Sequence, residues 1–313
     1  MEIRPFSEEH LEAAARLLAE RHERHLAAEP LLARDVDSAA QIRAELAHEG
    51  AAGAVALVRG EPQAYLIGRP TENDAVVGLA GCAATDAELV RDLYAALAAD
   101  WDRDRHRVYA PATDAALVDA WFRLAFGLQF TYAVRETTAP LAGAGGAEIR
   151  TGTVGDLPAV VALEQAFTEH LRASPSFSSR EPESDDAIRE EWAGTWDDPR
   201  FTHFVAERDG RVAGHLLFYR REPGDLRIPD NSIDLSLVVT QPDVRGSGVG
   251  VALTAHGLRW AHDQGYGAVT IDWRTCASPP RTRTSDSTQR ASNDAPASSR
   301  RSPSARSIGQ AAR

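Results

Sequence analysis

An apolar strand, a glycine-rich turn and a helix follow one another between residues 232 and 263, and this order constrains the fold most. Residues 232–240 (SIDLSLVVT) have the composition of a buried strand, and residues 251–263 have helical spacing. The turn between them, residues 245–250, reads RGSGVG. Glycines let backbone N–H groups approach an anion, and a helix start adds unpaired N–H groups and a favourable dipole. With Arg245 as a charged donor, the segment predicts a cradle for a diphosphate.

The spacing of the glycines decides between the known kinds of diphosphate loop. A P-loop ends in Gly-Lys-Ser/Thr, and this chain contains no lysine. A dinucleotide fingerprint needs its third glycine three residues after the second, whereas Gly250 follows Gly248 by two. Both types therefore fit weakly. A glycine turn that binds no ligand stays open as the structural alternative.

The order Arg245, Gly248, Gly250, between a strand and a helix, resembles motif A of the GCN5-related N-acetyltransferase (GNAT) family. The resemblance implies acetyl-CoA as cosubstrate, without a metal. It also implies an N-acetyltransferase that moves the acetyl group to an amine of a small molecule or peptide, by direct attack in a ternary complex. The strand end would pair with the pantetheine arm, and loop N–H groups would hold the pyrophosphate. The cofactor-binding residues implied in this way are Leu237, Val238, Val239, Arg245, Gly246, Ser247, Gly248, Val249 and Gly250.

Two parts of the chain are similar to GNAT domains. Residues 147–274 are predicted to contain two helices, three antiparallel strands, the loop with its helix, and a further strand, which is the GNAT order. Residues 1–140 resemble a second, degenerate copy, and residues 141–146 form a linker. The expected fold class is α/β (α+β), with two GNAT-like domains, each a mixed, mostly antiparallel sheet flanked by helices.

The first copy lacks the glycine loop. Gly78, Gly81, Asp86 and Glu88 stand where the cradle belongs, and two carboxylates there would repel a diphosphate. We therefore expect the first copy to bind no CoA.

The second copy changes character after residue 274. Residues 275–313 hold nine Ser, four Pro and seven Arg with almost no large apolar residue, so we expect them to be disordered. The GNAT pattern needs a further helix and strands there, so the C-terminal copy is expected to be incomplete, with an unpaired sheet edge. We interpret the segment as a replaced, for example frame-shifted, C-terminus. A non-catalytic acyl-CoA-binding or scaffold protein is therefore the alternative to an active enzyme.

Few residues qualify as catalytic groups. Asp234 is the candidate general base because its strand leads toward the expected acyl site; the alternative is a solvated Asp at a strand end. His203 and His215 lie on neighbouring predicted strands, where packing or surface roles are more common. Cys82 and Cys276 have no metal-ligand spacing, and Cys82 is expected to be a small buried side chain.

Charge and hydropathy limit the partners. The net charge of −12 disfavours nonspecific nucleic-acid binding, and no apolar run approaches the roughly 20 residues of a membrane span. The N-terminus lacks the apolar core of a secretory signal, so we expect a cytoplasmic protein. Acetyl-CoA and an unidentified amine are the expected partners, with no nucleic acid and no membrane. The oligomeric state is left open.

Overall fold

The computed structural model describes residues 1–138, 146–173, 182–221, 224, 226–274 and 306–312. Its first half alternates strands and helices as the sequence predicts. The strands are β1 (Glu2–Pro5), β2 (Ala52–Val58), β3 (Glu61–Pro70), β4 (Ala75–Val77), β5 (Cys82–Ala84), β6 (His106–Ala110) and β7 (Gly127–Glu136). The helices are η1 (Glu8–His10), α1 (Leu11–Ala28), α2 (Ser38–Leu46), η2 (Leu79–Gly81), α3 (Leu89–Ala98) and α4 (Ala115–Arg123).

The second half repeats this order up to its fifth strand. Its strands are β8 (Glu148–Thr151), β9 (Phe201–Arg208), β10 (Arg211–Tyr219), β11 (Ser232–Thr240) and β12 (Ala268–Arg274), followed much later by β13 (Arg306–Ala312). Its helices are η3 (Val154–Asp156), α5 (Leu157–Ala173), α6 (Asp185–Ala193), η4 (Pro242–Val244) and α7 (Val249–Asp263). The expected α/β class with two similar, mostly antiparallel halves is confirmed.

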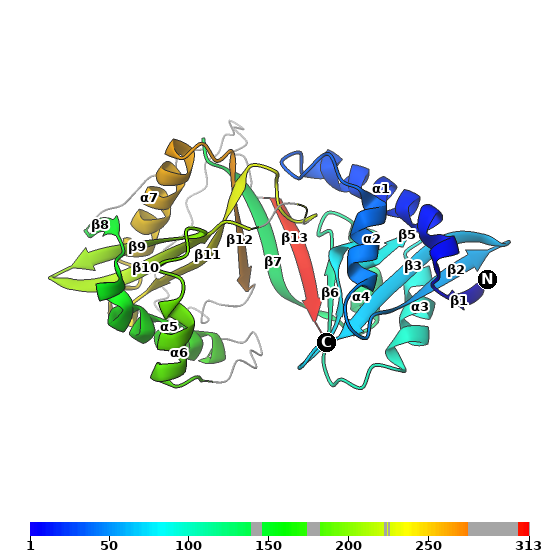
Figure 1. The fold of residues 1–313 in the computed structure, drawn as a ribbon, viewed down its shortest axis with the longest axis horizontal. Helices are drawn as coiled ribbons and strands as arrows, with labels where there is room; N and C mark the ends of the chain where they lie inside the picture. Colours follow the sequence, from blue (N-terminus) through cyan, green and yellow to red (C-terminus); the bar gives the residue numbers. More distant parts are fainter. Residues whose placement is uncertain (139–145, 174–181, 222–223, 225, 275–305, 313) are drawn as a thin grey trace, which may run out of the picture.

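The strands of both halves follow one continuous path of hydrogen-bonded neighbours (Figure 1). The order is β1-β2-β3-β4-β6-β13-β7-β12-β11-β10-β9-β8, with β5 pairing with β3 off this path. Two pairs in it are parallel, β4 with β6 and β11 with β12, and the others are antiparallel. Each half therefore contains one parallel pair of strands near the middle of the molecule. In the second half this pair is β11 and β12, which are connected through α7.

Strand β7 belongs to the first half in sequence and completes the second half in space. It pairs with β12 in antiparallel register from Ala268↔Glu136 to Arg274↔Phe130. The expectation of an unpaired edge on the second half is therefore wrong on the β12 side. The correction has a general reason, because a strand edge offers backbone donors and acceptors that any extended segment can satisfy.

Strand β13 corrects a second expectation. Residues Arg306–Ala312 form a strand between β6 and β7, antiparallel to both, so disorder does not extend over these seven residues. Without β13, the facing edges of β6 and β7 would lack these backbone partners. Pairing of this kind needs no apolar side chains, which is why composition does not predict it. Residues 275–305 and 313, also expected to be disordered, lie outside the described residues.

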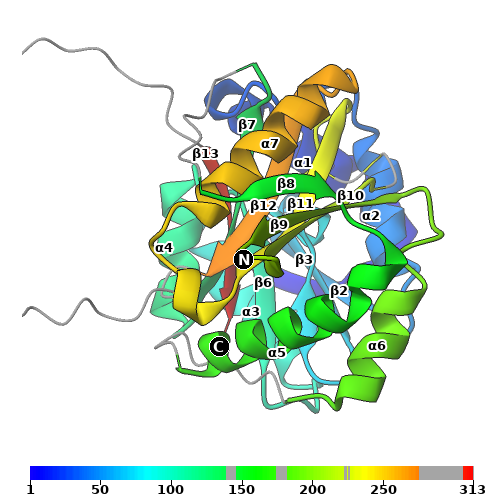
Figure 2. The same cartoon turned by 90° about the vertical axis from the view of Figure 1, so that its left-hand side faces the viewer.

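The helices lie on two faces of the sheet. Leu253 and Leu258 of α7 pack against Ile233, Leu235 and Val269 on one face. The neighbouring Ala268 points to the opposite face, where it joins the core beneath α1 and α2. Helices α5 and α6 also cover this opposite face, and Figure 2 shows them across the sheet from α7. The first two helices of each half thus share one face of the continuous sheet.

Candidate functional site

The parallel strands β11 and β12 separate at the place where the sequence predicts an acyl site. They pair from Ser232↔Ala268 to Leu235↔Ile271 and no further. At the same point β11 contains a bulge, because Leu235 and Leu237 face consecutive residues of β10 and leave Ser236 as the extra residue. A bulge bends its strand and ends regular pairing. Beyond it, β11 keeps its bonds to β10, and within the described residues no strand pairs with its other edge.

The three predicted strand residues lie on this stretch with an open edge. Leu237, Val238 and Val239 pair with β10 on one side only, opposite Leu217, Leu216 and His215. The bulge also turns the side chains. Leu235 packs beneath α7, whereas Leu237 packs on the α5 and α6 face. The open backbone edge is therefore formed by a partly buried stretch whose side chains pack on both faces.

The predicted loop follows this stretch directly and ends in a helix start. Gly246 has φ +80° and Gly248 has φ +91°, a left-handed conformation that favours glycine. Gly248 is the N-cap of α7, so Val249 and Gly250 are the first helical residues. The first N–H groups of a helix have no partner within it, and they point out of the helix end. The loop therefore combines a positive dipole end with backbone donors, as a diphosphate site requires.

Two side chains of the loop have different contacts. Arg245 is exposed, and its Nη1 lies 3.2 Å from His170 Nδ1 at the end of α5. Ser247 donates its hydroxyl to the Val244 carbonyl at 2.6 Å, and its backbone N–H bonds to the same carbonyl at 3.1 Å. Arg245 is thus placed where a flexible cation can reach an anion. Ser247 closes the turn, and the ligand role predicted for it stays a prediction.

Glycines without conformational strain hold α7 against the sheet. A Cβ on Gly257 would lie 2.9 Å from Phe218 Cε2 and 3.0 Å from Leu216 Cδ1. A Cβ on Gly214 of β10 would lie 2.9 Å from Leu253 Cδ1. Such distances are too short for a methyl group, so the close approach of α7 depends on these two glycines. This packing fixes the helix start relative to the open edge of β11.

Asp234, the predicted general base, is buried and fully engaged. Its Oδ2 accepts hydrogen bonds from Arg221 Nε at 2.9 Å and Nη2 at 2.6 Å, and its Oδ1 accepts from the Thr270 hydroxyl at 2.7 Å. The side chain is only 2% exposed, so the alternative of a solvated Asp is wrong. Both carboxylate oxygens therefore already accept hydrogen bonds from within the chain. The base role of Asp234 stays a prediction, and this geometry favours a structural role.

His203 and His215 form a buried pair under α6. His203 Nδ1 lies 3.1 Å from His215 Nε2, and the His203 ring stacks on Trp196 at 3.8 Å. Burial lowers the pKa of His203 to about 4 and that of His215 to about 3. Both rings are therefore neutral near pH 7, and the packing interpretation agrees with their burial.

The corresponding region of the first half is organised differently. Asp86 accepts a hydrogen bond from the backbone N–H of Glu88 through its carboxylate, at 3.0 Å. Its carbonyl accepts from Leu89 N–H at 3.1 Å, and the Ala87 carbonyl accepts from Val90 N–H at 3.1 Å. The backbone donors at the start of α3 are thus bonded within the chain. Glu88 also forms an ion pair with Arg123 at 2.6 Å, which adds to the contacts around this helix start.

The remaining sequence predictions concern cysteines and metals. Cys82 is buried in the core beneath α3, as expected, and burial raises the pKa of its thiol to about 12. Cys276 lies outside the described residues. Over the described ranges no three His, Cys, Asp or Glu side chains gather as metal ligands. In the same ranges, every helix is too short or too polar to cross a bilayer.

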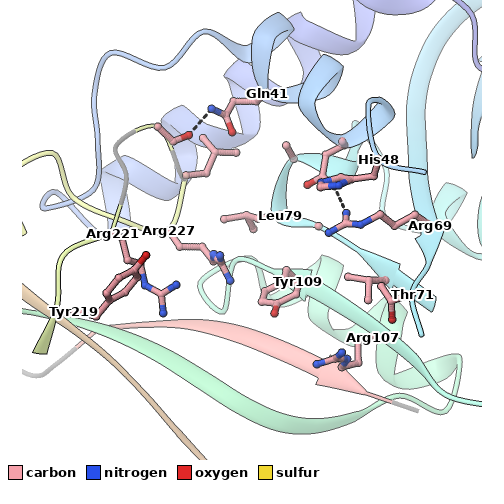
Figure 3. A pocket seen from close by; sticks show the side chains of 16 residues that line it. Gln41, His48, Arg69, Thr71, Leu79, Arg107, Tyr109, Tyr219, Arg221 and Arg227 are labelled. Atoms are coloured by element: carbon pink, nitrogen blue, oxygen red, sulfur yellow. Dashed lines mark hydrogen bonds and ion pairs between the residues drawn. The ribbon is translucent and has the colours of Figure 1, made fainter. Parts of the chain in front are cut away.

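Two features of the site region were missed by the sequence interpretation. The bulge at Ser236 has no sequence signature, because an extra residue in a strand keeps the apolar composition unchanged. The second feature is a cavity between the halves, lined by arginines from distant segments (Figure 3). All 34 basic residues of the chain are arginines. The sequence therefore does not indicate which of them lie together at this cavity.

Comparison with known proteins finds a family model and solved structures that are similar to this chain. The model of the acetyltransferase (GNAT) family matches residues 163–280. A GCN5-related N-acetyltransferase from Sphaerobacter thermophilus superposes on 100% of this chain and 95% of its own, with a TM-score of 0.60 and 14% identity. The GCN5-related glucosamine N-acetyltransferase region of a fungal multi-domain GH3 β-N-acetylglucosaminidase gives a TM-score of 0.52 at 11% identity. That match covers 87% of this chain and 37% of the fungal one.

A tandem GNAT protein from the clavulanic acid biosynthesis pathway is a further structural neighbour. It is 18% identical, covers 88% of this chain and 90% of its own, and has a TM-score of 0.47. No curated protein sequence matches the chain. The family match in the second half, together with the fold, supports a general acetyltransferase role.

Proposed function

We propose that the second half binds acetyl-CoA and transfers its acetyl group to an amine of a small molecule or peptide. The observation that carries this proposal is the continuity of the site. The open edge of β11 begins at the Ser236 bulge, where β12 diverges, and leads within a few residues to the glycine loop and the start of α7. One stretch of backbone thus offers strand pairing to an extended amide chain and N–H donors to a diphosphate.

The residues fit the parts of acetyl-CoA in order along the chain. Leu237, Val238 and Val239 would pair with the amide groups of the pantetheine arm in the manner of an added strand. The N–H groups of Gly246, Gly248, Val249 and Gly250 would hold the pyrophosphate, and Arg245 would add a charge-assisted bond. Ser247 would act by keeping the turn closed.

The chemistry needs few side chains. A backbone N–H near Val239 would polarise the acyl carbonyl, and the amine would attack its carbon directly once both are held in contact. The carbon–sulfur bond of the thioester would then break and release CoA as the thiol. The amine must lose a proton, and Asp234 is the candidate acceptor from the sequence. Its bonds to Arg221 and Thr270 give that role no support, so water beside β11 is the acceptor that we favour.

A non-catalytic acyl-CoA-binding or scaffold function is the second candidate. Its motivation is that the sequence of residues 275–313 does not match the family's closing helix and strands, and that β13 joins the sheet on the first half's side. Strand β7 covers the β12 edge in their place. The domain limits 1–140 and 147–274, with the linker 141–146, stay predictions under either function.

The experiment is acetyl-CoA titration by calorimetry, followed by measurement of thiol release with a panel of amines. We expect binding with a stoichiometry of one and thiol release with at least one amine. Binding without release from any amine would favour the non-catalytic function. A failure to bind would remove both candidates.

A further inference from the structure

A cavity of about 630 Å³ lies between the two halves (Figure 3). Its lining residues Leu79 and Leu226 belong to the core beneath α1 and α2. The first half contributes side chains from α2, β3 and β6. The second half contributes Tyr219 at the end of β10, and beyond it Arg221, Gly224, Leu226 and Arg227. This volume falls in the range of small-molecule sites, roughly 300–1,000 Å³. None of its lining residues belongs to the glycine loop or the open edge of β11.

The charge of the lining points to an anion. Four arginines, Arg69, Arg107, Arg221 and Arg227, line the cavity, against one carboxylate, Glu45. Arg69 pairs with Glu45 at 3.0 Å, which holds its guanidinium against α2. In Figure 3, Arg69 and Arg227 reach toward the cavity from opposite sides. A ligand between them would meet guanidinium donors from both halves.

Buried acids anchor two of these arginines from behind. Asp74 is bonded to Arg107 and also to Arg105, at 3.1 Å for the second pair. Asp234 anchors Arg221 in the same way. A guanidinium has five N–H donors, more than these carboxylates use, so the side chains are fixed in place with donors to spare. Fixed donors lose little entropy when a ligand binds.

Arg227 is held by aromatic rings. Its guanidinium carbon lies 4.9 Å from the ring centre of Tyr109 and 5.2 Å from that of Tyr132, one tyrosine on β6 and the other on β7. Stacking of this kind orients the planar guanidinium. Arg227 of the second half thus places its positive charge over strands β6 and β7 of the first half.

We propose that this cavity binds a small molecule carrying two or more oxyanion groups, phosphates or carboxylates. Guanidinium groups match both kinds of oxyanion in bidentate geometry. The arginines come from both sides of the cavity, so one ligand with separated charges can engage both halves. The site is independent of the acetyl-CoA loop and of the function proposed for it.

The test uses pyrophosphate and citrate as probes, titrated by calorimetry into the full chain carrying Gly250→Glu, which removes the other anion site. We expect at least one probe to bind with a stoichiometry of one. Arg227→Gln should weaken that binding at least tenfold, and Arg227→Lys should weaken it less. Preference for pyrophosphate would identify a phosphate ligand, and preference for citrate a carboxylate ligand.

A second variant keeps the test valid if Arg227→Gln fails to fold. Arg107→Gln leaves Asp74 paired with Arg105, so it should fold and also weaken probe binding. Arg259→Gln, an exposed arginine on α7, is the matched control and should change nothing. The proposal is overturned if neither probe binds, or if binding persists unchanged in both the Arg227 and the Arg107 variants.

Discussion

The two halves have the same order of elements. They differ in the strand that precedes helix α7 in the second half and helix α3 in the first. In the second half β11 runs through with a bulge of one residue at Ser236. In the first half the chain leaves the sheet after Val77, forms η2, and returns to β3 as β5. A small bulge keeps a continuous strand with one open edge. A larger interruption divides the strand into two short pieces, β4 and β5.

The loops after these strands also differ between the two halves. In the second half two glycines with positive φ present the start of α7. In the first half Asp86 uses its own carboxylate and carbonyl to occupy N–H groups at the start of α3. We propose that the first half binds no CoA, because an internal acid takes the place of an external anion at this helix start. The same order of elements thus presents glycines at one helix start and an acid bonded to the other.

The largest expected effect follows from adding a charge to the second half's loop. Gly250→Glu should lower acetyl-CoA affinity at least about 100-fold, about 2.7 kcal/mol, because a carboxylate would face the pyrophosphate. The fold should survive, since a Cβ on Gly250 meets only Thr240 Cγ2, at 3.6 Å. Gly250 is preferable to Gly248, whose positive φ would add strain. Calorimetry measures the affinity.

Matched variants separate charge from shape in this test. Gly250→Gln has nearly the same size without the charge, so it should retain much more affinity than Gly250→Glu. Asp86→Asn in the first half should leave affinity and stoichiometry unchanged. Equal binding by the Gly250→Glu variant and the wild type would refute the loop assignment, and a stoichiometry of two would refute the contrast between the halves.

A second difference concerns the core under the first helices of each half. Tyr65 and Ile67 lie under α1 and α2, whereas His203 and His215 lie under α6. The unfolded chain binds protons at these histidines near the ordinary pKa of 6.5, but in the folded chain burial lowers their pKa to about 4 and about 3. Stability should therefore fall as pH drops from 6.5 toward 4, by up to about 1.4 kcal/mol per pH unit for each histidine.

Urea unfolding at several pH values measures this effect. The double variant His203→Leu/His215→Leu should show a flatter dependence between pH 6.5 and 4 than the wild type. An unchanged slope in the double variant would show that the pair does not titrate as described.

Asp234 allows a sharper test of catalysis against structure. Asp234→Asn weakens the bonds to Arg221 and Thr270, so we expect a loss of about 2 kcal/mol in unfolding free energy. At temperatures where the variant is folded, its turnover rate and the pH profile of that rate should stay close to the wild type. If turnover instead slowed at least about 100-fold while stability stayed unchanged, Asp234 would be identified as the base.

The smallest expected effect concerns the packing of α7. Gly257→Ala should destabilise the protein by about 1 kcal/mol, since the clash with Phe218 and Leu216 exceeds the gain in helix propensity. Gly194→Ala, where no atom lies within 4 Å of the added Cβ, is the matched control and should be neutral. Thermal unfolding measures both, and equal melting temperatures would contradict the close packing of α7.

Much of the local structure could be predicted from the sequence. The hairpin at Asp209-Gly210, with φ +54° and +73°, follows from the residues that tolerate such angles. The glycine loop and the start of α7 follow from short-range chemistry in the same way. The bulge at Ser236 and the bonds of Asp234 could not be predicted, because both depend on contacts with β10, Arg221 and Thr270.

By itself, the sequence determined the order of strands and helices, the repeat of that order, and the position of the loop, since each depends on residues close together in the chain. Only the tertiary structure decided that β7 completes the second half, that β13 enters between β6 and β7, and that arginines of both halves converge on one cavity. The physical reason is that strand edges pair through backbone groups common to all residues. Which edges meet, and which side chains then converge, depends on the whole fold.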